Sequence, residues 1–189
     1  MEAVMKRELI SDKKLCRLLA VGAFIIFTAL SAFVRIPLPF TPVPLTLQTF
    51  FVLLSGALLG RKLGGLTQGA YMFLGLTGQE IFTNASRGSF YLLGPTGGYI
   101  VGFVLAAYFA GSFLIKEKQS VFEVFIKLLA ADFIILFSGM FWLKVILSCS
   151  WSKAFLLGFL PFVLGDILKV ALATVVYHKM RARFKAVLY

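Results

Sequence analysis

Six apolar segments follow one another along this chain, and their length constrains the fold more than any other feature. They span residues 18–34, 47–60, 63–76, 99–115, 128–147 and 159–177. A helix needs roughly 20 apolar residues to cross the hydrocarbon layer of a bilayer. The second and third segments are shorter, so they either extend into the flanking glycine-rich turns or are partly buried inside a bundle. We therefore expect an all-α integral membrane protein with six transmembrane helices, or five if the short segments do not both span.

Composition and the placement of charge indicate one membrane domain over residues 1–189. Hydrophobic residues make up 60% of the chain and charged residues 14%, with no second composition regime that would mark a soluble domain. If the spans alternate in direction, most Lys and Arg residues fall on one side of the membrane. Basic residues concentrate in cytoplasmic loops, so both termini, including the basic segment 1–17, are predicted to be cytoplasmic. Topology and attraction to membrane lipid then explain the net charge of +11, and we expect no nucleic-acid partner.

Two charged residues, Asp166 and Lys169, interrupt the last apolar segment. Ionised groups at membrane depth are costly, so they usually face a cavity or the interior of the bundle. Their i,i+3 spacing puts both on one helical face, where the carboxylate accepts hydrogen bonds from the ammonium. The pair is predicted to bind a small polar solute.

The first loop on the outer side, residues 35–48, contains four prolines within eight residues. Proline fixes its own torsion and disfavours helix at the preceding residue, so this segment should be stiff and extended. It suits the wall of a pocket, although a rigid connector is the alternative. Gln48, at its end, offers neutral hydrogen bonds at the rim.

The second outer loop, residues 77–96, is long for so small a protein, which is typical of a functional loop. Asn84 offers an amide donor and acceptor, and Arg87 offers a fork suited to a carboxylate. The aromatic residues Tyr91 and Tyr99 provide surfaces for an apolar ring. A solvated loop charge and an interfacial aromatic belt are the alternatives for these residues.

A second carboxyl within the apolar segments, Asp132, raises the alternative of an intramembrane aspartyl protease, in which two carboxyls share one proton. Topology places Asp132 near the cytoplasmic side and away from Asp166, so we expect it to pair with Lys127 or with a helix start. The chain has no nucleophile–base constellation, no metal-ligand cluster and no phosphate loop of the GxxxxGKS/T type. We therefore expect no enzymatic activity and no cofactor, with ATP used only by partner subunits.

Three motifs resemble those of the BioY family, the substrate-binding S-components of biotin transporters of the energy-coupling-factor (ECF) class. They are TPVPLTLQTF at residues 41–50, GPTGGYIVGF at 94–103 and LPFVLGDILK at 160–169. The resemblance implies a six-helix subunit in the plasma membrane of a prokaryote, with its pocket on the extracytoplasmic side. It also implies a transmembrane T-component and two ABC-type ATPases as partners.

The resemblance assigns ligand contact to Asp166 and Lys169, and the chemistry of these side chains suits biotin. Asp166 can accept from a ureido N–H, and Lys169 can neutralise Asp166 and donate to a carbonyl or carboxylate. Asn84, Arg87, Gln48, Tyr91 and Tyr99 complete the expected site on chemical grounds. An S-component for another vitamin, or a carrier that works alone, remains the alternative function.

Overall fold

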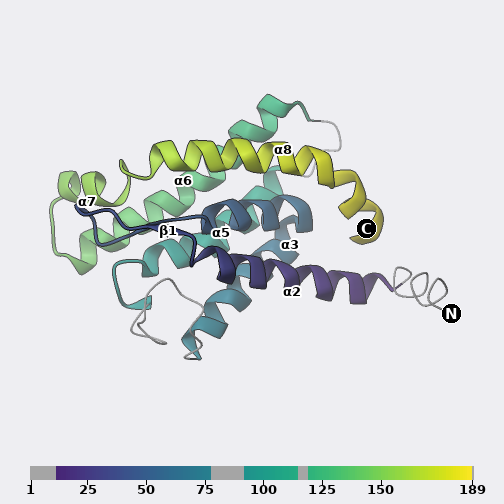
Figure 1. Ribbon diagram of the computed structural model, residues 1–189, viewed down its shortest axis with the longest axis horizontal. Helices are drawn as coiled ribbons and strands as arrows, with labels where there is room; N and C mark the ends of the chain where they lie inside the picture. The colour runs from purple at the N-terminus through teal and green to yellow at the C-terminus, as the bar shows by residue number, and fades with distance from the viewer. Residues whose placement is uncertain (1–11, 78–91, 115–118, 189) are drawn as a thin grey trace.

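The computed structural model describes residues 12–77, 92–114 and 119–188, and this part of the chain is predominantly helical (Figure 1). It contains six helices and one antiparallel two-stranded ribbon, in which Arg35 pairs with Thr46 and Ile36 with Leu45. The expected all-α class is confirmed. The elements are α2 (Lys13–Ser31), β1 (Arg35–Ile36), β2 (Leu45–Thr46), α3 (Gln48–Leu76), α5 (Gly97–Phe113), α6 (Val121–Ile146), α7 (Trp151–Gly158) and α8 (Val163–Leu188).

The six apolar segments correspond in chain order to α2, the two halves of α3, α5, α6 and α8. By length and composition, α2 and α6 can each cross a membrane, and the 29 residues of α3 pass the same test when its two halves are taken together. The helices α7 and α8 pass the same test together, with a bend of 49° between them. The remaining helix, α5, is apolar but only 17 residues long. Helix ends differ from segment ends, since helical hydrogen bonding continues into polar residues, as at the end of α8.

A sharp bend at Gly60 explains the two short segments. This residue has φ 77° and ψ 173° inside α3, a conformation that glycine adopts at little cost. The two halves of α3 then fold back on each other so closely that a Cβ atom on Gly64 would lie 2.6 Å from the Cα of Gly56. Both segments are thus partly buried in the bundle, as their length suggested.

The core forms where α3 packs against α5, α2 and α8, and where α6 packs against α5, α7 and α8. Large apolar side chains also cover much of the outer surface; examples are Leu164, Phe122 and Leu168, each more than 70% exposed. Apolar side chains on the outside suit contact with lipid, where helices satisfy their own backbone hydrogen bonds.

The beginning of α2 and the end of α8 lie at the same end of the bundle (Figure 1). The Nε of Arg17 donates to the carbonyl oxygen of Leu188 at 2.9 Å, which ties the two helix ends together. This placement agrees with an even number of membrane crossings. The cytoplasmic location of that end stays a prediction.

Candidate ligand-binding site

A cavity lies at the end of the bundle away from these two helix ends, where the ribbon meets the first turns of α3, α5 and α8. It contains about 480 Å³ of empty space, including its open mouth. Most of its walls are apolar, formed by Val43, Pro44, Leu45, Ile100, Phe103, Ile135, Leu136 and Phe162. Its polar lining consists of Thr46, Gln48, Thr49, Thr96, Tyr99, Asp166 and Lys169. A concave, mostly apolar space with a few polar groups is typical of small-molecule sites.

The proline-rich loop forms one wall because the ribbon closes it at its base. The prolines lie between β1 and β2, where the chain needs no continuous helical hydrogen bonds. The hydroxyl of Thr41 donates to the carbonyl oxygen of Leu157 at 2.7 Å and fixes the loop to the end of α7. The prediction of a non-helical wall over a pocket agrees with this arrangement.

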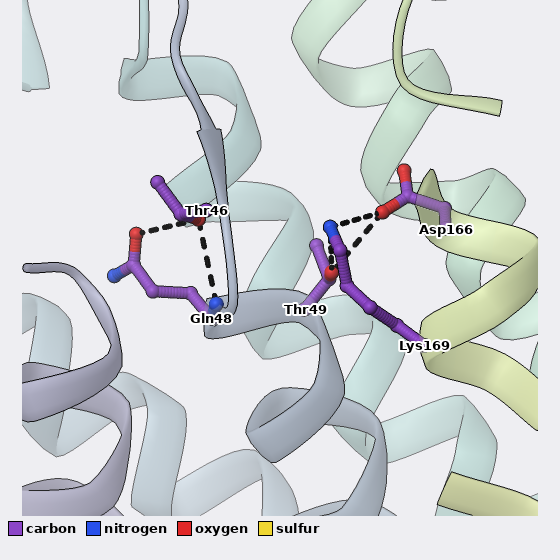
Figure 2. Close-up of polar contacts among 5 residues, drawn as sticks. All are labelled: Thr46, Gln48, Thr49, Asp166 and Lys169. Carbon is purple, nitrogen blue, oxygen red and sulfur yellow. Dashed lines mark hydrogen bonds and ion pairs between the residues drawn. The ribbon is translucent and has the colours of Figure 1, made fainter. Parts of the chain in front are cut away.

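Asp166 and Lys169 form the expected ion pair in the first turns of α8. The Nζ of Lys169 lies 2.6 Å from Oδ1 of Asp166, and the two side chains are 11% and 3% exposed. Thr49 of α3 joins them: its Oγ1 accepts from Lys169 at 2.9 Å and donates to Oδ1 of Asp166 at 3.2 Å (Figure 2). Three polar groups from two helices therefore meet at one point on the cavity wall.

Sequence reasoning did not select Thr49 as a site residue. Two signals point to it: it follows Gln48 directly in the TPVPLTLQTF motif, and it lies in the first turn of a helix that begins at the outer loop. Its contact with Asp166, 117 positions away, depends on how α3 packs against α8 and has no local signature.

Gln48 lines the cavity beside Thr49, as expected for the rim. Its amide Nε2 donates to the hydroxyl of Tyr71 at 2.7 Å. Its Oε1 accepts from Thr46 at 3.2 Å (Figure 2). Both ends of the amide are therefore held by protein groups. A ligand contact with Gln48 has to share or replace one of these hydrogen bonds.

Tyr99 contributes its ring to the cavity, while its hydroxyl is used elsewhere. The hydroxyl donates to the carbonyl oxygen of Gly158 at 2.5 Å. The ring packs edge-on against Phe162, with 5.8 Å between ring centroids, and lies so close to α6 that a Cβ on Gly139 would sit 2.2 Å from it. This position agrees with the expected apolar contact.

The remaining candidates, Asn84, Arg87 and Tyr91, lie outside the described residues. Of the seven residues expected to contact ligand, the structure brings four to one cavity: Gln48, Tyr99, Asp166 and Lys169. Their role in binding stays a prediction. Within the described residues, no group of three or more His, Cys, Asp or Glu side chains is placed to hold a metal ion.

The expected partner of Asp132 was wrong. Lys127 donates to Oε1 of Gln119 at 3.0 Å instead, and Asp132 lies in the middle of α6, far from a helix start. Asp132 is 1% exposed, and its Oδ1 has no hydrogen-bond partner in the described part of the chain. Asp132 precedes Ile135 and Leu136 by one helical turn, and both of these residues line the cavity, so it lies nearer to the site than topology suggested. Oδ1 of Asp166 is bonded to Lys169 and Thr49, an arrangement unlike a carboxyl pair that shares a proton.

Comparison with known proteins adds independent findings. Residues 5–186 match the family model described as the BioY family. The chain is 39% identical to the probable biotin transporter BioY of Pyrococcus horikoshii over 161 residues, which cover 85% of this chain and 93% of that protein. It is 37% identical to the biotin transporter BioY of Thermotoga maritima over 166 residues, or 87% of this chain and 95% of that protein. Among solved structures it is similar to the S-component for biotin from an ECF-type ABC transporter, with a TM-score of 0.87, 28% identity, and coverage of 94% of this chain and 98% of that chain.

Proposed function

The chain belongs to the BioY family, and on that basis we propose that it is the biotin-binding membrane subunit of an ECF-type ABC importer. In this role it captures biotin on the extracytoplasmic side of the membrane. One observation carries the proposal: a cavity in the helical bundle combines mostly apolar walls with a buried ion pair.

The polar groups of the cavity match the functional groups of biotin. The ureido ring of biotin presents two N–H donors and a carbonyl oxygen, and the fused thioether ring is apolar. Both contacts of Asp166 within the described residues use Oδ1, so Oδ2 is available to accept from a ureido N–H. An ammonium has three donors, and the two used by Asp166 and Thr49 leave one of Lys169 for a carbonyl oxygen or the carboxylate.

The apolar walls complete the fit. The rings of Tyr99 and Phe162 and the side chains of Ile135 and Leu136 face the same space as the ion pair. Burying the thioether ring and the aliphatic chain there removes apolar surface from water, which contributes about 25 cal/mol per Å². The ion pair then selects orientation, while the walls supply most of the binding free energy.

The proposed role includes partners that supply the energy for import. A transmembrane T-component and two ABC-type ATPases assemble with the subunit, and they alone use ATP. The subunit itself performs no chemistry on biotin and needs no cofactor. It lies in the plasma membrane of a prokaryote with both termini in the cytoplasm, where the basic residues concentrate.

A binding isotherm with purified protein in detergent tests this proposal. We expect saturable binding of biotin at one site per chain, with affinity at least about a hundredfold above that for thiamine or riboflavin. Tighter binding of another vitamin would overturn the choice of biotin. Vesicles that contain the subunit alone should bind biotin without accumulating it, and accumulation should require the ATPase module. Accumulation by the subunit alone would favour a self-sufficient carrier.

A further inference from the structure

Asp132 is a buried carboxyl that the proposed binding chemistry does not use. It lies on α6 one helical turn before Ile135 and Leu136, which line the cavity, so its side chain is beneath the cavity floor on the same helical face. The residue is 1% exposed, and its Oδ1 finds no hydrogen-bond partner in the described residues. An ionised carboxylate in such a place is unstable, because a buried charge without a partner costs several kcal/mol in free energy.

The charges around Asp132 lead to the same conclusion. On α8, the charged groups on this side of the bundle are Asp166 and Lys169, which line the same cavity as Ile135 and Leu136. On α5, Tyr99 is titratable, and its hydroxyl is bonded to Gly158. Two other helices, α3 and α7, also pack against α6. Their cations are exposed at the surface: Arg61 and Lys62 at the bend of α3, and Lys153 on α7.

Among the described residues that line the cavity, Lys169 carries the one positive charge near these two carboxyls, and it is already bonded to one of them. Lys169 is bonded to Asp166 at 2.6 Å, and Thr49 supports this pairing through both partners. If Asp132 were also ionised, the group would carry a net negative charge in a low-dielectric interior. Binding of one proton removes that charge.

We propose that Asp132 is a proton-binding site, protonated at neutral pH, which keeps Lys169 paired with the carboxyl that lines the cavity. When Asp132 loses its proton, it competes with Asp166 for the ammonium and draws Lys169 away from the cavity wall. Asp132 is then a positioning residue, which acts on the ligand through Lys169. This inference rests on the proposed biotin-binding function of the same site.

Infrared spectroscopy tests the proton directly and needs no ligand. At about pH 7, the wild type should show the carbonyl band of a protonated carboxyl that is missing from Asp132→Asn, since Asn has nearly the same size and cannot ionise. Glu123→Gln, on the exposed first turn of the same helix, is the matched control and should leave the band unchanged, because Gln also serves in a capping box. A wild type without this band would overturn the proposal. If Asp132→Asn does not fold, the band can be followed in the wild type alone and should vanish at alkaline pH.

The pH dependence of biotin binding tests the positioning role. The stabilising effect of the proton is present below the pH at which Asp132 ionises and is lost as the pH rises through that value. Wild-type affinity should therefore fall about tenfold between about pH 7 and the alkaline pH at which the infrared band is lost. Asp132→Asn should bind biotin within about twofold of the wild type at about pH 7 and keep that affinity at the higher pH.

Failure of the proposed biotin-binding function and failure of the positioning role of Asp132 give different experimental results. A wild type that does not bind biotin at about pH 7 contradicts the proposed function, whereas the infrared band still reports on the proton. The same alkaline loss of affinity in Asp132→Asn and the wild type would assign the loss to another group and would overturn the positioning role. A large loss of affinity in Asp132→Asn at about pH 7 would also overturn it, because the ionised form would then be the active one.

Discussion

Replacing Asp166 with Asn should separate the contribution of the ion pair to stability from its contribution to binding. Asp166→Asn keeps the size of the side chain and an oxygen that accepts from Lys169, but it removes the negative charge. Lys169, whose side chain is 11% exposed, is then left with a buried charge and only neutral partners. Breaking a fully buried pair costs about 3–5 kcal/mol in unfolding free energy. Because an amide oxygen remains and the ammonium is partly accessible, we expect about 2 kcal/mol here.

The effect on binding should be at least tenfold, or about 1.4 kcal/mol in binding free energy. The amide of Asn presents either a weaker neutral acceptor or its N–H₂ group to the ureido N–H of biotin. Hydrogen bonds to a charged group contribute about 1.5–3 kcal/mol, against about 1 kcal/mol for neutral ones. The difference between these values sets the expected loss.

A double-mutant cycle with Lys169→Met gives the two contributions separately. The double variant has no unpaired charge, so its unfolding free energy should recover to within about 1 kcal/mol of the wild type, above that of either single variant. Biotin binding should remain weak in the double variant, because both polar contacts are missing. Leu164→Ala, two positions before Asp166 but 78% exposed toward the outer surface, is the matched control and should bind normally.

Chemical unfolding in detergent micelles and titration calorimetry with biotin provide the two measurements. Biotin affinity of Asp166→Asn within twofold of the wild type would remove the carboxylate from the ligand site. Recovery of binding in the double variant would show that the single substitutions act through misfolding. Either result would refute the claim that the buried pair Asp166 and Lys169 binds the ligand directly.

Two further variants examine the groups that support the pair and the apolar wall. Thr49→Val, which replaces the hydroxyl between the two charges by a methyl group, should weaken biotin binding about three- to tenfold, whereas Thr49→Ser should bind within about twofold of the wild type; equal affinities in calorimetry would contradict this role. Gly139→Ala should lower the unfolding free energy by about 1–3 kcal/mol, because the added methyl overlaps the ring of Tyr99, while Gly22→Ala, with open space around it, should be neutral or slightly stabilising in the same unfolding assay.

Local rules predicted the helices well and the contacts between them poorly. The length of apolar segments gave the helical class, and the prolines of residues 35–48 gave a non-helical wall. The i,i+3 pairing of Asp166 and Lys169 followed from helix geometry alone. The role of Thr49 and the position of Asp132 depend on which faces of α3, α6 and α8 meet, and a single sequence has no local signal for that packing.

The depth of Asp132 in the bundle was predicted wrongly because the apolar segment is shorter than the helix that contains it. A residue near the start of an apolar segment was expected near the cytoplasmic surface, but α6 begins at Val121, well before the segment 128–147. The extra helical turns move Asp132 into the middle of the helix. Its distance from a helix start then removes the dipole stabilisation that the sequence argument had assumed.

The position of the cavity along the helices gives the two buried carboxyls different surroundings. The first turns of three helices meet there: Gln48 and Thr49 begin α3, Thr96 precedes α5, and Asp166 lies in the first turn of α8. Helix beginnings carry free N–H groups and a partial positive charge, which stabilise a carboxylate such as Asp166 and attract acceptor oxygens of a ligand. Asp132 lies in the middle of α6, away from a helix beginning, and its Oδ1 has no hydrogen-bond partner in the part of the chain that the structure describes. The same bundle therefore holds one carboxyl paired at the cavity wall and one without such a pair beneath it, and the difference arises from where each lies along its helix.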